Sequence, residues 1–159
     1  MTRAVPVGLG EVRLSRDPEE QLCVFGLGSC VAVFLYSPTA PAVGLAHVVL
    51  PRSPDPSAAD AAEPGRYADR AVPLLVQQLT RAGVRQGALK AAIAGGAAVL
   101  GFTSAIGEHN VRAVREQLRQ FGIPIEQEDV GGQRGRSVLF DGAQFRLDVR
   151  VLAAPNIDI

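Results

Sequence analysis

The stretch FGLGSCVAVFLY, residues 25–36, places two glycines, a serine and a cysteine between two runs of β-prone residues. β-branched and aromatic residues such as those of VAVFLY are typical of strands. Gly26 and Gly28 allow a tight bend with positive φ. The stretch therefore predicts two strands joined by a glycine bend that carries Cys30, either as a nucleophile or as a small buried side chain.

Further strand-like and helix-like segments lie on both sides of this bend. Apolar residues at helical spacing predict a helix over Tyr67–Ala82 and a second, following GFTSAIGEHN, with Val111, Val114, Leu118 and Phe121 on one face. A glycine ends each helix. Short β-prone runs predict the strands Val7–Arg13, Gln21–Phe25, Val43–Leu50, Leu89–Ala97, Ile123–Gln127, Ser137–Phe140 and Phe145–Val151. This distribution predicts an α+β fold, with two main helices on one side of a mixed or largely antiparallel sheet, or of two packed sheets.

The bulk properties point to one soluble domain of ordinary size, spanning residues 1–159. Acidic and basic residues balance at 16 each, which argues against nucleic acid or an anionic membrane as a partner. We expect a cytoplasmic location, because the sequence has neither a signal peptide nor a stretch long enough to insert in a bilayer. The polar, proline-rich segment Arg52–Gly65 predicts a mobile loop.

Three kinds of site are disfavoured by residue spacing. The glycines of the bend lack the third glycine and the following helix of a dinucleotide-binding loop. Cys23, Cys30, His47 and His109 would suffice in number for zinc but contain no local chelating pair, so no metal is expected. Ser29 stands outside the G-x-S-x-G pattern of a serine nucleophile and is interpreted as a turn or orienting residue.

Cys30 and His47 are the candidates for thiol catalysis. Such chemistry requires a thiolate, an imidazole within hydrogen-bond reach and donors for an oxyanion. Glycines 26 and 28 would let a cysteine at this bend be exposed beside outward-facing amides. Residue types alone favour the alternative, a core histidine and a buried cysteine, so the residues leave the choice open.

The segment DVGGQRGR, Asp129–Arg136, combines three glycines with two arginines. It could bind a carboxylate, a phosphate or an acidic partner through its guanidinium groups. A polar hairpin loop is the alternative interpretation.

Six blocks follow one another along the chain in a characteristic order: GLGSCVAV (26–33), GLAHVVLP (44–51), RYADRAV (66–72), AAIAGGA (91–97), IGEHN (106–110) and DVGGQRGRSV (129–138). In this order they resemble the CheD family, bacterial chemoreceptor glutamine deamidases. The resemblance covers nearly the whole chain. It implies a fold like that of the catalytic domain of cytotoxic necrotizing factor toxins.

The resemblance also implies a reaction and a set of site residues. Members hydrolyse glutamine side chains to glutamate in the cytoplasmic helical region of chemoreceptors, some also hydrolyse glutamyl methyl esters, and some bind a CheC-type phosphatase. Cys30 matches the family's nucleophile and His47 matches its base. The implied reaction passes through a thioester intermediate and uses no cofactor. The remaining candidates are Gly26 and Gly28 for the turn and oxyanion, Val24 and Ser29 for orienting His47, and, on the substrate side, Tyr67, Asp69, Gly95, Gly96, His109, Asn110 and Arg136.

Two positions depart from the family pattern. Val24 stands where members commonly carry a threonine that orients the histidine. Either something else holds His47, namely Ser29, a backbone carbonyl or water, or the enzyme is slower. His109 stands where an arginine is usual, which affects the expected contacts with substrate. A binding module that has kept the fold without catalysis is therefore the second functional hypothesis.

Overall fold

The computed structural model describes residues 1–55, 62–99 and 105–153. In this part of the chain, two sheets pack on each other and two α-helices cover one outer face. The helices are α1 (Ala68–Arg81) and α2 (Ile106–Gln120), with a short 3₁₀ turn η1 (Gln86–Ala88) after α1. The predicted α+β class with two packed sheets is confirmed.

The sheet next to the helices has five strands in the order β2, β5, β4, β6, β7. Their bounds are β2 (Val12–Ser15), β5 (Ala40–Val48), β4 (Val31–Ser37), β6 (Lys90–Gly95) and β7 (Ile125–Val130). β6 and β7 are parallel and joined through α2, whereas the other neighbours are antiparallel. The second sheet has the order β1 (Arg3–Pro6), β3 (Glu20–Leu27), β8 (Arg136–Asp141) and β9 (Arg146–Val151).

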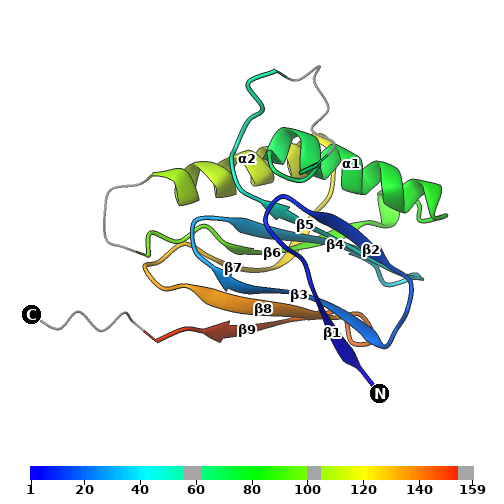
Figure 1. Cartoon of the computed structure of the whole chain (residues 1–159). Coiled ribbons are helices and arrows are strands. Elements are labelled where there is room, and N and C mark those ends of the chain that lie inside the picture. Colours follow the sequence, from blue (N-terminus) through cyan, green and yellow to red (C-terminus); the bar gives the residue numbers. More distant parts are fainter. Residues whose placement is uncertain (56–61, 100–104, 154–159) are drawn as a thin grey trace, which may run out of the picture.

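The central strand β4 is buried on both faces, which explains its uninterrupted apolar sequence. Val31, Val33 and Leu35 face the core beneath the helices. Ala32 and Phe34 face the second core, between the two sheets. Figure 1 shows these layers, with α1 and α2 on one side of the five-stranded sheet and β3, β8 and β9 on the other.

Two sequence predictions are wrong in detail. The expected strand Val7–Arg13 is mostly the turn between β1 and β2, where Gly10 has a φ of 73°. The end of the predicted mobile loop Arg52–Gly65 is packed, since buried Gly65 donates a backbone hydrogen bond of 2.7 Å to Gly10. Residues 56–61 of that loop lie outside the described part of the chain. The likeness to the toxin domain stays a prediction.

Candidate active site

Strand register brings Cys30 and His47 together at one end of the layer between the sheets. Cys30 directly precedes β4, and Ala32 of β4 pairs with His47 of the neighbouring antiparallel strand β5. Side chains alternate along a strand, so Cys30 lies on the same face as Ala32 and His47, diagonally from the histidine. Diagonal neighbours in such a pair have Cα atoms roughly 7–8 Å apart, within reach of long side chains. Cys30 is half-buried and His47 is 6% exposed.

The bend that carries Cys30 is held by the glycine loop after β6. Gly96 donates its N–H to the Cys30 carbonyl at 2.9 Å, and Ala97 donates to the Gly28 carbonyl at 2.9 Å. Gly95 has a φ of 112°, and a Cβ built there would lie 2.1 Å from the Cys30 carbonyl oxygen. Only glycine therefore allows β6 to approach the bend this closely.

His47 is oriented by the turn between β1 and β2. Its Nδ1 lies 3.1 Å from the Val7 carbonyl oxygen. Because a carbonyl oxygen can only accept, Nδ1 carries the proton, and Nε2 of the neutral ring is left with a free lone pair. The turn is itself tied to β5, since His47 donates its backbone N–H to the Glu11 carbonyl and its carbonyl accepts from Gly10, each at 3.0 Å. A backbone carbonyl thus does the orienting that Val24 cannot.

Val24 lies on β3 of the facing sheet, 1% exposed, in the same inter-sheet core that the Cys30 side chain packs against. Its side chain therefore belongs to the layer that contains His47. Ser29 is half-buried in the bend, and within the described residues its hydroxyl has no hydrogen bond to His47.

Burial pushes both titratable groups towards their neutral forms. It raises the pKa of the Cys30 thiol above its ordinary value of 9.0, and the nearby Arg66 charge partly opposes this. It also lowers the pKa of His47 below 6.5, an effect partly opposed by the Val7 and Gly8 carbonyls and by Glu11. At neutral pH these shifts favour the uncharged thiol of Cys30 and the neutral imidazole of His47 rather than an ion pair.

Arg66 is a residue that the sequence analysis missed as a part of the site. Its guanidinium lies 5.8 Å from the centre of the Tyr67 ring and 2.9 Å from a Glu63 carboxylate oxygen, and its positive charge favours the Cys30 thiolate. The block RYADRAV was the available signal. An arginine two residues before a helix is usually a solvated surface residue, so the position of Arg66 near the thiol depends on the fold.

Asn110 is fully buried on α2 and reaches the backbone on both sides of the site. Its Nδ2 donates to the Ser29 carbonyl at 3.0 Å and to the Val49 carbonyl at 2.9 Å. Ser29 immediately precedes Cys30, and Val49 is two residues after His47. Asn110 thus has contacts of its own within the protein, whereas His109 beside it is exposed.

The other predicted residues occupy supporting places. Gly26 has a φ of 70° in an irregular part of β3 and donates its N–H to the Ser137 hydroxyl at 3.1 Å, so this amide is engaged. Tyr67 precedes α1, where the carboxylate of Asp69 accepts the N–H of Ser53 at 3.0 Å.

Arg136 is 5% exposed and is used inside its own loop. It contacts the Asp129 carboxylate at 2.5 Å and the carbonyls of Asp129, Gly131 and Arg134. Its guanidinium therefore closes the DVGGQRGR loop on itself. The segment is a polar loop but not the expected hairpin, because it links β7 of one sheet to β8 of the other and these two strands do not pair.

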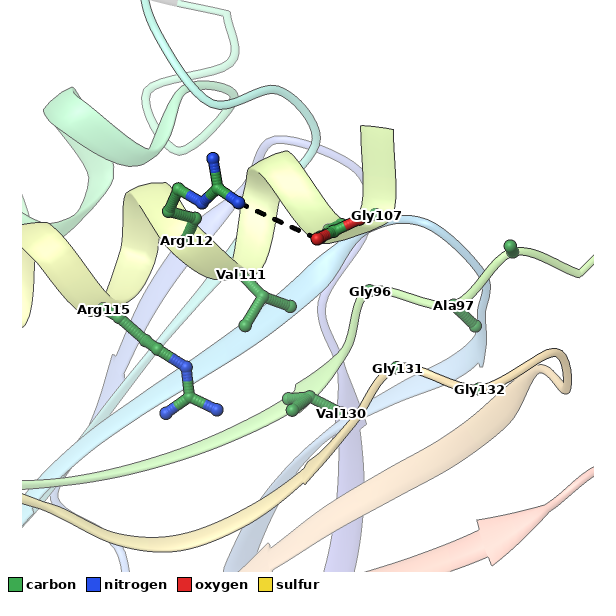
Figure 2. A pocket seen from close by; sticks show the side chains of 11 residues that line it. Gly96, Ala97, Gly107, Val111, Arg112, Arg115, Val130, Gly131 and Gly132 are labelled. Atoms are coloured by element: carbon green, nitrogen blue, oxygen red, sulfur yellow. Dashed lines mark ion pairs between the residues drawn. The ribbon is translucent and has the colours of Figure 1, made fainter. Parts of the chain in front are cut away.

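A hollow of about 480 Å³ lies beside the Cys30 bend, between α2 and two glycine loops. Figure 2 shows Val111 and Arg115 of α2 pointing towards the side of the hollow that holds Gly96 and Gly131, whereas the Arg112 side chain lies along the helix. The Arg112 side chain pairs with Glu108 at 3.7 Å, and Arg115 with Glu128 at 2.7 Å. Cys30 does not line this hollow, because the loop after β6 separates them.

No group of three or more histidine, cysteine or acidic side chains gathers in the described residues in a way that could hold a metal ion. Cys23 is buried on β3, apart from the bend. Neither α1 nor α2, the helices of the described segments, has the length and apolar character needed to span a bilayer.

Residues 49–151 match the sequence profile of the family described as CheD chemotactic sensory transduction. The chain belongs to the CheD family. A Clostridium botulinum member, named "Probable chemoreceptor glutamine deamidase CheD", is 34% identical over 162 residues, covering 99% of this chain and 98% of that protein. A Clostridium kluyveri CheD of the same name is 37% identical over 155 residues, 94% of each chain.

Two solved structures superpose on part of this CheD family member, with sequence identities lower than those of the Clostridium relatives. The Bacillus licheniformis protein YfiH has a TM-score of 0.47 and 14% identity, covering 82% of this chain and 59% of that one. YlmD from Geobacillus stearothermophilus has a TM-score of 0.47 and 16% identity, covering 76% of this chain and 51% of that one.

Proposed function

We propose that this protein hydrolyses glutamine side-chain amides of chemoreceptors to glutamates, with Cys30 as nucleophile and His47 as general base and acid. The observation that carries the proposal is the pairing of Ala32 with His47 across β4 and β5, which gives Cys30 and His47 a common face. The names of the two Clostridium relatives support chemoreceptor glutamines as the substrate.

In the first half of the reaction, Nε2 of His47 takes the proton of the Cys30 thiol as sulfur attacks Cδ of the glutamine. The neutral state of both groups suits this order, because the thiolate then forms only as it reacts. Backbone amides at Gly28–Cys30 stabilise the oxyanion of the tetrahedral intermediate. His47 then gives its proton to the leaving nitrogen, the C–N bond breaks, and ammonia leaves a thioester on Cys30.

In the second half, His47 takes a proton from water as the water oxygen attacks the thioester carbon. The C–S bond breaks, the proton returns from His47 to sulfur, and glutamate is released. A glutamyl methyl ester offers the same acyl carbon with methanol as leaving group, so the site also suits ester hydrolysis. Neither reaction requires a metal or an organic cofactor.

The bond from His47 Nδ1 to the Val7 carbonyl supports activity despite Val24. A residue that fixes the tautomer and ring orientation of a catalytic histidine does so by accepting from the nitrogen that does not react. A main-chain carbonyl meets this requirement as well as a threonine hydroxyl would. The absence of the family threonine therefore leaves the base intact in this proposal.

A docking module without catalysis is the alternative, and Val24 is the observation that favours it. Such a protein would bind the helical part of receptors, or a CheC-type phosphatase, and its cysteine would be dispensable. Under the main proposal these same proteins remain the expected partners.

The test is mass spectrometry of a receptor cytoplasmic fragment incubated with wild type, Cys30→Ala and Cys23→Ala. We expect wild type and Cys23→Ala to convert defined glutamines to glutamates, with ammonia released, and Cys30→Ala to convert none. Cys23→Ala controls for loss of a small buried thiol. Full conversion by Cys30→Ala would refute the thiol mechanism, and binding of the fragment without conversion by any of the three would favour the docking module.

A further inference from the structure

Asn110 joins the main chain at Cys30 to the main chain at His47 through a single amide group. Its two Nδ2 protons match two acceptors, the Ser29 carbonyl at 3.0 Å and the Val49 carbonyl at 2.9 Å. The side chain is fully buried on α2, so both bonds are shielded from water. A shift of either strand end relative to α2 must therefore break or bend one of these bonds.

The bond to Ser29 also sets the direction of the Cys30 amide. The Ser29 carbonyl and the Cys30 N–H belong to one peptide group, and in a trans peptide these two groups point in opposite directions. Because the carbonyl is directed at α2, the N–H is directed away from it, towards the inter-sheet side against which Cys30 packs. Among residues 1–55, 62–99 and 105–153 this N–H has no hydrogen-bond acceptor.

We propose that Asn110 is a positioning residue that holds the Cys30 N–H ready for the oxyanion and keeps the nucleophile in register with His47. The inference rests on the proposed function, since it assigns the oxyanion donor of that reaction. Asn110 itself touches neither substrate nor the reacting atoms. It acts through the Ser29–Cys30 peptide.

The choice of an amide supports this assignment. A flipped or aspartate side chain would direct an oxygen at two carbonyl oxygens, which repel it, so only the NH₂ group fits. Within the described residues Asn110 Oδ1 has no hydrogen-bond partner although it is buried. Such an unsatisfied acceptor is unfavourable for stability, so an apolar residue would serve better if the position only filled space.

The test compares Asn110→Ala with Val114→Ala, a matched truncation one turn further along α2. Val114 is also fully buried, but it packs in the helix-side core and its side chain makes no hydrogen bond. Two rates are measured for each variant: deamidation of a receptor fragment, and alkylation of Cys30 by iodoacetamide across pH. Alkylation requires the thiolate but forms no oxyanion, and buried Cys23 reports any general opening of the fold by becoming reactive.

For Asn110→Ala we expect kcat to fall roughly 10- to 100-fold with KM nearly unchanged, as for an oxyanion donor that is misaligned. The alkylation profile of Cys30 stays like that of wild type, and Cys23 stays unreactive. Val114→Ala keeps the wild-type kcat. If Asn110→Ala does not fold, Asn110→Ser, which retains a donor for one carbonyl, should show a smaller loss of the same kind.

A wild-type kcat in the folded Asn110 variant would overturn the inference. An equal loss of kcat in Val114→Ala would do the same, as would a loss of kcat in Asn110→Ala that is matched by slower alkylation of Cys30. These outcomes are distinct from failure of the proposed function. In that case either Cys30→Ala itself would remain active, or wild type would bind the receptor fragment without converting it.

Discussion

Gly95→Ala tests how closely catalysis depends on the approach of β6 to the Cys30 bend. The added Cβ would lie 2.1 Å from the Cys30 carbonyl oxygen, whereas real Cβ atoms essentially never come closer than 3.0 Å. The bend or β6 must therefore move by about 0.9 Å. That movement falls on the Cys30 carbonyl, which accepts the Gly96 N–H at 2.9 Å and belongs to the proposed nucleophile.

Two costs set the size of the effect. A non-glycine residue at a φ of 112° is strained by about 1–3 kcal/mol, and loss of the Gly96 bond adds about 0.5–1.5 kcal/mol. We expect the free energy of unfolding to fall by about 1.5–4.5 kcal/mol. A misplacement of about 1 Å at a reacting group can lower the rate by about 10²-fold, so kcat should fall by about that factor.

Gly83→Ala is the matched control, because Gly83 has a similar φ of 95° but open space where its Cβ would go. It should lose stability through backbone strain alone and keep the wild-type kcat. Urea unfolding gives the stabilities, and ammonia release from a receptor fragment gives kcat. Equal kcat values in Gly95→Ala and Gly83→Ala would refute the view that close packing of β6 on the Cys30 bend positions the nucleophile.

Three further changes test the electrostatics and packing of the site. Arg66→Gln should raise the pKa of the Cys30 thiol further, because a positive charge that favours the thiolate is removed. The pH midpoint of iodoacetamide alkylation of Cys30 should therefore move to higher pH. Arg66→Lys keeps the charge and should leave this midpoint nearly unchanged. The reverse movement in Arg66→Gln would show that this charge does not act on the thiol. Val24→Thr should keep or raise activity, since the Val7 carbonyl already holds His47. It should lower the free energy of unfolding by about 1–3 kcal/mol unless the new buried hydroxyl finds a hydrogen-bond partner. A collapse of kcat would contradict the role of Val7 in orienting His47. The lowered pKa of His47 means that the unfolded chain takes up a proton at higher pH than the folded one, so stability is retained above pH 6.5 and falls as pH drops through the folded pKa. The urea midpoint of wild type should therefore fall more between pH 7.5 and 5.5 than that of His47→Gln, and equal decreases would be inconsistent with a buried neutral imidazole.

Most elements of the fold follow from local pattern. The apolar run of β4, the helical spacing of Tyr67–Ala82 and the alternation of Phe145–Val151 each predict the element that forms there. Val7–Arg13 fails because β-prone valines flank Gly8 and Gly10, and the chain turns at the glycines instead of continuing as a strand. The prediction that the loop is mobile up to Gly65 is also wrong at that end. The burial of Gly65 depends on a backbone hydrogen bond to a turn more than fifty residues earlier in the chain.

The candidate site likewise contains residues that the sequence predicts and residues that it does not. Cys30 and His47 can be singled out from the sequence because a cysteine at a glycine bend and a histidine in an apolar segment are unusual, and the order of the six blocks adds the family's expected roles. What orients His47 cannot be found in this way, because Val7 contributes a main-chain oxygen and any residue type carries one. Asn110 and Arg66 act on the Cys30 bend from a distant helix and a distant loop.

By itself, the sequence determined the element types and the two residues with reactive side chains, because periodicity and residue chemistry are local properties. Only the tertiary structure decided which strands are neighbours, and therefore that Cys30 and His47 share a face. It also decided the charge state of the pair, since the pKa of each group depends on burial by both sheets and on carbonyls and charges contributed by separate segments. These are effects of distance in space, and strand register sets that distance.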